Sequence, residues 1–406
     1  MGFVGRKPTN APLTSDDIPN GIIGAADLAT GLSKLTWDTT AKTSGFTAVS
    51  NTGYVCNTTS SAFTVTLPAS PTAGDTIQIV DYAGTFDTNA LTISPNGNKI
   101  EGSTNSHTLN GEREGVRLVY IDSTQGWLAY SGINEGTDVL ELAPIIIDFL
   151  VIAGGGGGGG KRGGGGGAGG YREFTSQNVN IATNYTVTIG AGGAGNGLVA
   201  EAASSGSNSV FSSFTSNGGG GGGSNSAGGE SSNGASGGSG GGGGGSGTFN
   251  GTGGTGNTPS TSPSQGNSGA TSPSETGGGG GGANAAATNQ NGGNGTASSI
   301  TGTSITRAGG GGGGTTGSPA GTGGTGGGGD GSTSTNGTNG TVNTGGGGGG
   351  GSNNTGGTGG SGIVIIKYPD TVTISNPGGG LTSSTATAGG FSVTSFTAGT
   401  GTIQFN

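Results

Sequence analysis

Short segments in the first third of the chain alternate between apolar and polar residues. The clearest is Phe-Thr-Val-Thr-Leu at residues 63–67. Similar short β patterns occur at residues 76–80, 91–93, 117–121 and 127–130. A period of two is expected of half-buried strands, and the Pro, Asn and Gly residues between the segments predict turns. This pattern predicts a small β domain of sandwich, barrel or β-prism type over residues 46–145.

Two continuous apolar segments bracket the next region. Residues 145–153 (IIIDFLVIA) come before it, and residues 362–368 (GIVIIKY) come after it. Each has the composition of a buried strand, and we expect the two strands to pair and close the domain between them. Both are shorter than the roughly 20 apolar residues of a transmembrane helix, so no membrane insertion is expected. Residues 390–397 and 401–405 predict further short strands, in a terminal hairpin or paired with a neighbouring subunit.

Between the bracketing strands, glycine replaces any apolar periodicity. Gly accounts for 82 of the 207 residues from 154 to 360. Uninterrupted runs occur at residues 154–160, 163–167, 218–223, 240–245, 277–282, 309–314 and 345–351, separated by inserts rich in Ser, Thr, Asn and Ala. Charge falls at the same point, from 15 acidic and 7 basic residues in 1–153 to 6 and 5 in 154–406. This change near residue 150 predicts a domain boundary.

Two interpretations of the glycine runs compete. Gly- and Ser-rich sequences are typical of flexible linkers. A linker gains nothing from uninterrupted runs, whereas a bundle of polyglycine II helices requires them, because any side chain would hold neighbouring helices apart. In such a bundle the N–H and C=O groups point outward and pair with neighbouring helices. The uninterrupted runs and the bracketing strands favour the ordered bundle.

Composition excludes several classes of protein. Charged residues make up 8 % of the chain and hydrophobic residues 27 %, so an enzyme built on one large apolar core is not expected. Glycine keeps no strict three-residue period, which excludes collagen. The single Cys56 and the single His107 argue against a disulfide framework, a Cys-based zinc site and a His-based catalytic triad. The net charge of −9 argues against binding to nucleic acid.

Motifs that carry catalytic chemistry are incomplete in this sequence. Gly155-x4-Gly160-Lys161 resembles a phosphate-binding loop, but Arg162 stands where a magnesium-binding Ser or Thr is needed. The six acidic residues after residue 153 are isolated from one another, unlike the paired carboxylates of a glycosidase. We therefore expect no enzymatic activity, no cofactor and no metal site.

One set of segments resembles a known family. The segments in this set are a strand entering a glycine run at residues 149–155, GGYRE at 169–173, YTVTIGAGG at 185–193, NSVF at 208–211 and GSGIVIIKYP at 360–369. Together, over residues 146–370, they resemble the glycine-rich domains of bacteriophage tail fibre and adhesin proteins. Residues 46–132 also look like the small β domains near the base of such fibres, many of which are trimeric.

The resemblance implies a homotrimeric adhesin of the virion that is made in the host cytoplasm. Residues 1–45 would be an extended leader that attaches to other tail proteins, followed by the β domain (46–145). The glycine-rich polyglycine II domain (146–370) would bind a host cell-surface protein or polysaccharide through loops at one end, and C-terminal strands (371–406) would follow. The alternative is a cellular glycine-rich extracellular structural protein that self-assembles into fibres. The lack of an apolar secretion signal in the first residues counts against that alternative.

Receptor contacts are expected in the polar inserts, because exposed loops on a rigid scaffold commonly carry binding. Small polar side chains suit hydrogen bonds to sugars or protein surfaces, and occasional larger side chains serve as anchors. The candidate contact residues are Phe249, Asn250, Asn257, Gln265, Asn289, Gln290 and Arg307.

Overall fold

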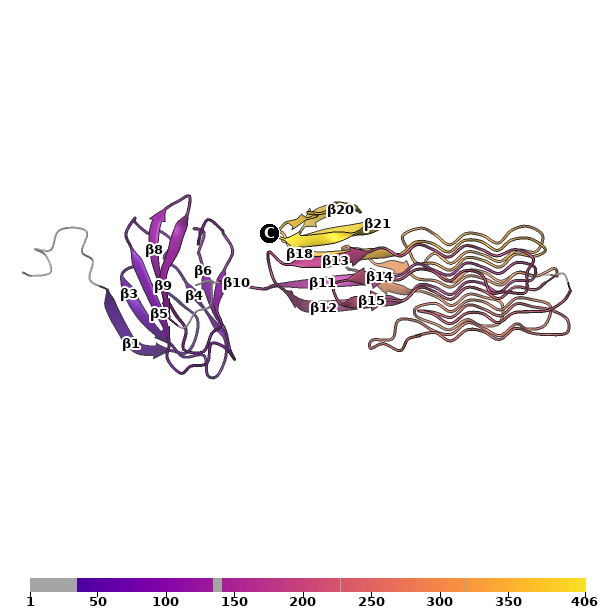
Figure 1. Ribbon diagram of the computed structural model, residues 1–406, viewed down its shortest axis with the longest axis horizontal. Helices are drawn as coiled ribbons and strands as arrows, with labels where there is room; N and C mark the ends of the chain where they lie inside the picture. Colours follow the sequence, from indigo (N-terminus) through magenta and orange to yellow (C-terminus); the bar gives the residue numbers. More distant parts are fainter. Residues whose placement is uncertain (1–34, 134–140, 227, 318) are drawn as a thin grey trace, which may run out of the picture. The chain divides into compact units, whose positions relative to one another are not determined.

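The computed structural model describes residues 35–133, 141–226, 228–317 and 319–406 (Figure 1). These residues form two units, one ending at Ala143 and the other beginning at Pro144. Every regular element in the described ranges is a β-strand, which confirms the expectation of a mainly β fold with little helix. No helix in these ranges is long and apolar enough to cross a membrane. Most of the predicted leader, up to residue 34, lies outside the described residues.

Two five-stranded sheets make up the first unit, in the orders β1-β3-β5-β8-β9 and β10-β7-β6-β4-β2. Strands β1, β3 and β5 are parallel in one sheet, and β2, β4 and β6 are parallel in the other, so from β1 to β6 the chain crosses to the other sheet after each strand. The bounds are Thr36–Lys42 (β1), Phe46–Thr47 (β2), Thr52–Cys56 (β3), Phe63–Thr66 (β4), Thr76–Asp81 (β5), Leu91–Ser94 (β6), His107–Leu109 (β7), Gly115–Asp122 (β8), Gly126–Ile133 (β9) and Glu141–Leu142 (β10). Residues 36–42, which the sequence placed in the leader, thus pair with the β domain.

Side chains from both sheets meet in an apolar core. In β5, Ile77 and Ile79 are fully buried while Thr76 and Gln78 are half-buried, as a period of two requires. Val65 and Trp127 are also fully buried in this cluster. The first unit is therefore held together by interlocking hydrophobic side chains.

The strands of the second unit form one large sheet and a separate β16–β17 hairpin. Their bounds are Ile145–Ile152 (β11), Tyr171–Val179 (β12), Asn184–Thr188 (β13), Ser209–Phe211 (β14), Phe214–Ser216 (β15), Thr296–Ser298 (β16), Ile305–Arg307 (β17), Ile363–Pro369 (β18), Ile374–Ser375 (β19), Leu381–Ala388 (β20) and Phe391–Phe405 (β21). The bracketing segments pair antiparallel as expected, β11 with β18. The two predicted C-terminal strands are one continuous strand, β21, which pairs first with β18 and then with β13.

The second half of strand β11, residues 149–152, is buried on both faces. Phe149 and Val151 pack with Phe211 in one apolar cluster, while Leu150 and Ile152 pack with residues of the glycine-rich segments in another. Burial on both faces explains why four consecutive residues are apolar here, whereas Ile146 near the start of the strand is exposed.

Glycine runs extend from the ends of these strands and lie side by side (Figure 1). We call the described residues of 154–170, 190–208, 217–295 and 308–362 the glycine array. Its innermost run is 163–168, whose N–H and C=O groups bond to six other runs. The N–H groups donate in turn to runs 345–351, 218–223 and 277–282, and the carbonyl groups accept from runs 309–314, 154–160 and 239–245. Each neighbour recurs after three residues.

The same three-residue repeat holds in run 154–160. Gly154 and Gly157 donate to Ser207 and Ser204, and Gly155 and Gly158 donate to Gly360 and Gly357. The uninterrupted glycine runs of the sequence are thus the inner runs of the array, and they are buried. Their backbone polar groups are satisfied by neighbouring runs in place of water.

Steric contact explains why residues 163–167 of the innermost run are all glycine. A Cβ added at Gly165 would overlap the carbonyl oxygen of Gly311, and one at Gly166 would overlap that of Gly156. A backbone carbonyl cannot give way without moving its own run, so alanine is excluded as well as larger residues.

Outer runs carry side chains. On the solvent side, where no neighbouring run is present, these side chains supply hydrogen-bond partners for the backbone. Asn291 and Asn294 accept hydrogen bonds through Oδ1 from the N–H groups of Thr322 and Thr325, at 3.0 and 3.1 Å. Asn339 accepts from Thr358 in the same way, at 2.9 Å. The Asn, Ser and Thr residues of the mixed segments therefore complete the hydrogen bonding at the edge of the array.

Candidate binding surface at the distal end of the glycine array

Consecutive runs point in opposite directions, so the inserts between them lie alternately at the two ends of the array. We call the end away from β11 and β18 the distal end. The inserts toward that end are 160–163, 197–202, the described residues of 225–231, 246–250, 272–276, 288–291, the described residues of 315–320, 332–336 and 352–355. Segments that are far apart in sequence therefore form one surface.

The turn Lys161–Arg162 links several of these inserts. It joins run 154–160 to the innermost run, which places it among the other distal loops. Lys161 donates through Nζ to the carbonyl of Ser226 at 2.7 Å, and Arg162 donates through Nε to Thr316 Oγ1 at 2.9 Å. Arg162 Nη1 also lies 3.8 Å from Glu275 Oε1. These contacts tie three loops from distant parts of the chain to one basic turn.

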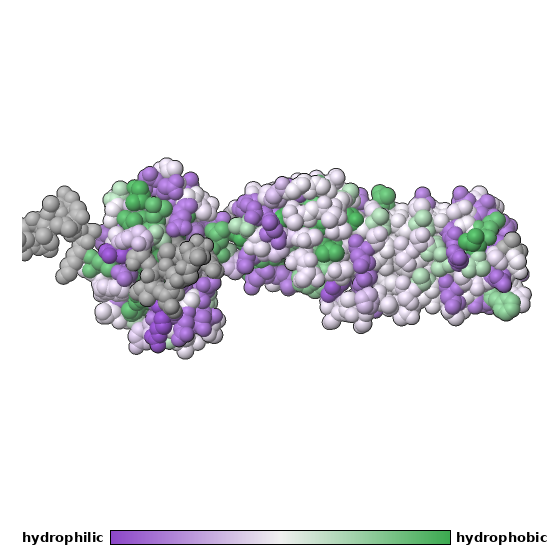
Figure 2. Space-filling model, in the orientation of Figure 1, coloured by the Kyte–Doolittle hydropathy of each residue, from purple (hydrophilic) through white to green (hydrophobic). Residues whose placement is uncertain are grey.

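Three large apolar side chains are exposed on the distal loops. Leu198 and Val199 are 50 % and 45 % exposed, and Phe249 is 63 % exposed. Figure 2 shows hydrophobic and hydrophilic residues mixed at this end, in contrast to the pale glycine surface beside it. Exposed apolar side chains among polar loops have the composition of a protein-binding surface.

A shallow depression of about 370 Å³ lies on the same end. It is lined by Ser334, Thr335, Asn336 and Asn354, all of which are exposed. Asn354 donates through Nδ2 to the carbonyl of Ser334 at 3.0 Å, which fixes two distal loops to each other. Hydroxyl and amide groups of this kind both donate and accept hydrogen bonds, so the depression offers polar partners to a ligand.

Four of the seven candidate contact residues lie toward the distal end, two of them in one loop. Phe249 is exposed there, and Asn250 is next to it in the same loop. In the amide orientation that satisfies its hydrogen bonds, the side-chain nitrogen of Asn250 donates to the carbonyls of Ser246 and Ser274, so it supports the loop.

Asn257, Gln265 and Arg307 lie elsewhere, whereas Asn289 and Gln290 lie toward the distal end. Asn257 and Gln265 belong to the loop at the opposite end, where Gln265 is fully buried and accepts from the N–H of Asn217 at 2.8 Å. Asn289 and Gln290 form a turn whose carbonyls accept from two inner glycine runs. Receptor contact by these residues stays a prediction.

Arg307 is buried, at 7 % exposure, beside Tyr171 and Glu173. Tyr171 donates to Glu173 Oε2 at 2.7 Å, and Ser298 donates to Oε1 at 2.6 Å. Burial lowers the pKa of Arg307, while the neighbouring Tyr171 and Glu173 oppose that shift. This polar cluster joins β12 to the β16–β17 hairpin and lies at the strand end of the array.

Sequence reasoning missed Lys161, Arg162, Leu198, Val199 and the residues of the depression. The sequence does contain a signal for these residues, because successive inserts alternate between the two ends of the array. An insert that follows a run going away from the β-strands lies at the distal end. Counting runs from the strand at 145–153 assigns each insert to an end, whereas polarity alone does not.

The comparison with known families agrees with this architecture. The glycine-rich domain family matches residues 140–369, which is more than half of the chain, and the chain belongs to that family. No curated protein matches the sequence.

Proposed function

We propose that the glycine array is a bundle of polyglycine II helices. The support is the recurrence of each hydrogen-bonded neighbour after three residues, which is the number of residues per turn of that helix. Six neighbours around the innermost run correspond to hexagonal packing of such helices. Hydrogen exchange over residues 154–360 tests this: strong protection of the runs with rapid exchange in the inserts is expected, and uniformly rapid exchange would overturn it.

We further infer that the chain is a phage tail fibre or adhesin protein, carried on the virion, that binds the host cell surface. One observation carries this proposal: many distal loops with varied side chains converge on one end of a rigid array. Phe249, Leu198 and Val199 would provide apolar anchors, and the Ser334–Asn336 loop would provide hydrogen bonds to a surface protein or polysaccharide. The buried Gln265 and Arg307 are left out of this surface.

Loss of adhesion with retention of the fold tests the binding surface. We expect Phe249→Ala combined with Leu198→Ser to abolish binding of the purified protein to host cells. Val342→Ser is the matched control, because Val342 is 67 % exposed but lies in a turn at the opposite end. Equal binding by both variants would contradict the proposal.

Attachment to the virion is assigned to the N-terminal region, and three copies would raise the avidity of weak single contacts. Deleting residues 1–45 should abolish incorporation into particles and leave cell binding by the purified protein intact. Because residues 36–42 pair with the β domain, deletion of residues 1–34 is the cleaner version of this test. Sedimentation of the purified chain as a monomer would argue against the homotrimer.

The uncharged C-terminal segment favours the alternative of a self-assembling fibre protein. Residues 371–406 contain no Asp, Glu, Lys or Arg, and seven of the eight residues of β20 are exposed. Strand edges without charge readily pair with other chains. Fibres that form from the purified protein without any tail component would support this second function.

A further inference from the structure

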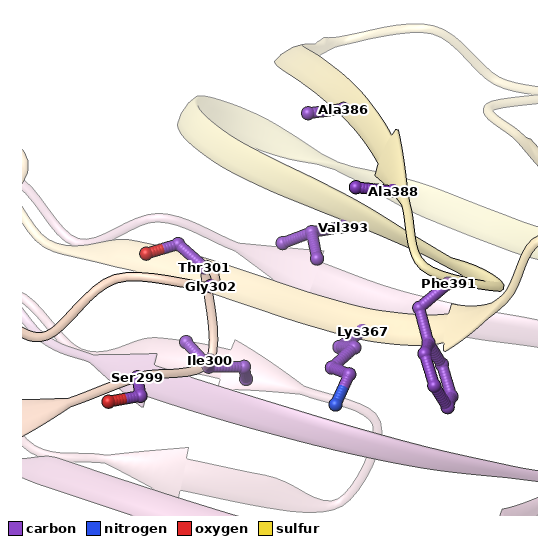
Figure 3. A pocket seen from close by; sticks show the side chains of 9 residues that line it. All are labelled: Ser299, Ile300, Thr301, Gly302, Lys367, Ala386, Ala388, Phe391 and Val393. Atoms are coloured by element: carbon purple, nitrogen blue, oxygen red, sulfur yellow. The ribbon is translucent and has the colours of Figure 1, made fainter.

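A cavity of about 270 Å³ opens in the second unit, away from the distal loops (Figure 3). Four segments enclose it: the turn 299–302 after β16, Lys367 of β18, the end of β20, and the start of β21. Figure 3 shows Ile300 and Val393 in its middle, with Lys367 and Phe391 together at one side. The cavity brings together side chains from widely separated parts of the chain.

The walls of this cavity consist mainly of methyl groups. Ile300, Val393, Ala386 and Ala388 supply apolar surface, and Ile300 is buried at 7 % exposure. Ser299 and Thr301 come from the facing turn, and Figure 3 shows their hydroxyl groups pointing away from Val393 and Phe391. A ligand that fits must therefore present a small apolar group to these walls.

Lys367 and Phe391 define the polar side of the cavity. The ammonium of Lys367 lies 4.4 Å from the ring centre of Phe391 and 3.7 Å from Asp148 Oδ2. Among the described residues, Lys367 Nζ makes no hydrogen bond. Because Asp148 already balances the charge, a neutral oxygen such as an amide carbonyl suits this donor better than a second carboxylate does. Phe391 is 42 % exposed, so part of its ring is open to a ligand.

We propose that this cavity binds an N-acetylated hexosamine unit of a polysaccharide. The acetamido methyl would lie against Ala386, Ala388 and Val393, and its carbonyl oxygen would accept a hydrogen bond from Lys367. The C–H face of the sugar ring would pack on Phe391, on the same side of the cavity as Lys367. The volume equals about nine water molecules at roughly 30 Å³ each, which suits one sugar ring.

This site is separate from the distal surface and does not depend on it. A sugar bound here would attach to the strand end of the array, where glycine runs give way to β18 and β21. The site therefore adds a carbohydrate-binding function to the one proposed for the loops.

Saturation-transfer NMR with the full-length protein tests the ligand class. N-acetylglucosamine and N-acetylgalactosamine are the probes, and glucose and galactose are the controls. We expect the strongest transfer at the acetamido methyl protons and little transfer to the control sugars. Equal transfer to all four sugars, or none to either acetylated sugar, would overturn the proposal.

Substitutions locate the site. Ala386→Leu fills the cavity and Lys367→Met removes the hydrogen-bond donor while keeping the aliphatic chain, so each should weaken binding about tenfold or more. Ser383→Leu is the matched control, because it lies on the same exposed strand but does not line the cavity. Unchanged binding in a folded Ala386→Leu protein would contradict the assignment. Cell adhesion through the distal loops is measured with Phe249→Ala, which should leave sugar binding unchanged.

Discussion

The interiors of the two units are built from different parts of the chain: side chains in the first unit and backbone in the glycine array. In the first unit, side chains such as Ile79, Leu91 and Trp127 fill the space between two sheets. In the glycine array, the interior consists of backbone, and each inner run is held by hydrogen bonds to its neighbours. The first kind of core depends on the volume and shape of side chains, and the second depends on their absence.

This difference predicts different responses to mutation. A side-chain core adapts in part, so its losses are graded with the volume removed or added. A backbone core has no rotamers to adjust, so adding one methyl group must move a whole run. The following predictions test the contrast, beginning with the largest expected effect.

Substitution of an inner glycine should be the most damaging change. Gly311→Val places side-chain atoms where the carbonyl of Gly348 lies, and Gly279→Val does so at the carbonyl of Asn291. We expect each to cost at least about 4 kcal/mol or to prevent folding of the second unit. Denaturant unfolding followed by far-ultraviolet circular dichroism measures the loss.

Gly197 provides the matched control for those variants. No atom lies within 4 Å of a Cβ added there. Gly197→Ala should therefore change stability by less than about 0.5 kcal/mol. If Gly197→Ala and Gly311→Ala cost the same, the explanation from backbone packing fails.

Side-chain truncation in the first unit should give an intermediate and graded effect. Ile79 is fully buried, so Ile79→Ala should cost about 2–5 kcal/mol and Ile79→Val about 0.5–1.5 kcal/mol. Both tryptophans, Trp37 and Trp127, lie in this unit, so their fluorescence reports its unfolding. Equal losses for the two variants would contradict a graded core.

Removal of an edge acceptor should cost less. Asn294→Ala leaves the N–H of Thr325 without its side-chain partner, although water can replace that partner at the surface. We expect a loss of about 0.5–1.5 kcal/mol. Asn294→Asp keeps the acceptor and should retain most of the stability, and a loss as large as that of Asn294→Ala would argue against the role of Oδ1.

A change of pH should produce the smallest difference in stability between the two units. Burial lowers the pKa of His107 in the first unit. As pH falls below the unfolded value of about 6.5, the unfolded state binds a proton that the folded state resists, so the first unit loses stability. Tryptophan fluorescence during unfolding at pH 8 and pH 5.5 measures this. His107→Gln should remove the difference in stability between the two pH values. If the difference persists in this variant, other groups cause it.

Much of this fold was predictable from sequence, for physical reasons that vary by region. Alternation at residues 63–67 and 76–80 marks strands because each strand there has one buried face. The uninterrupted glycine runs identified the inner positions of the array, because only those positions exclude a Cβ from every direction. Polar composition alone does not mark a residue for binding, since Gln265 and Asn339 hydrogen-bond to backbone within the array. The burial of Arg307 could not be predicted from the sequence either, because its neighbours Tyr171 and Glu173 are more than 130 positions away in the chain.

The pairing of β11 with β18 has a mechanical consequence. The array begins at the end of one of these strands and returns to the start of the other, so both of its chain ends are clamped at one place. A pull on the distal loops acts along the runs and loads many inter-run hydrogen bonds in shear at the same time. The runs therefore share tension collectively, and one loop cannot be drawn out without dislodging its neighbours.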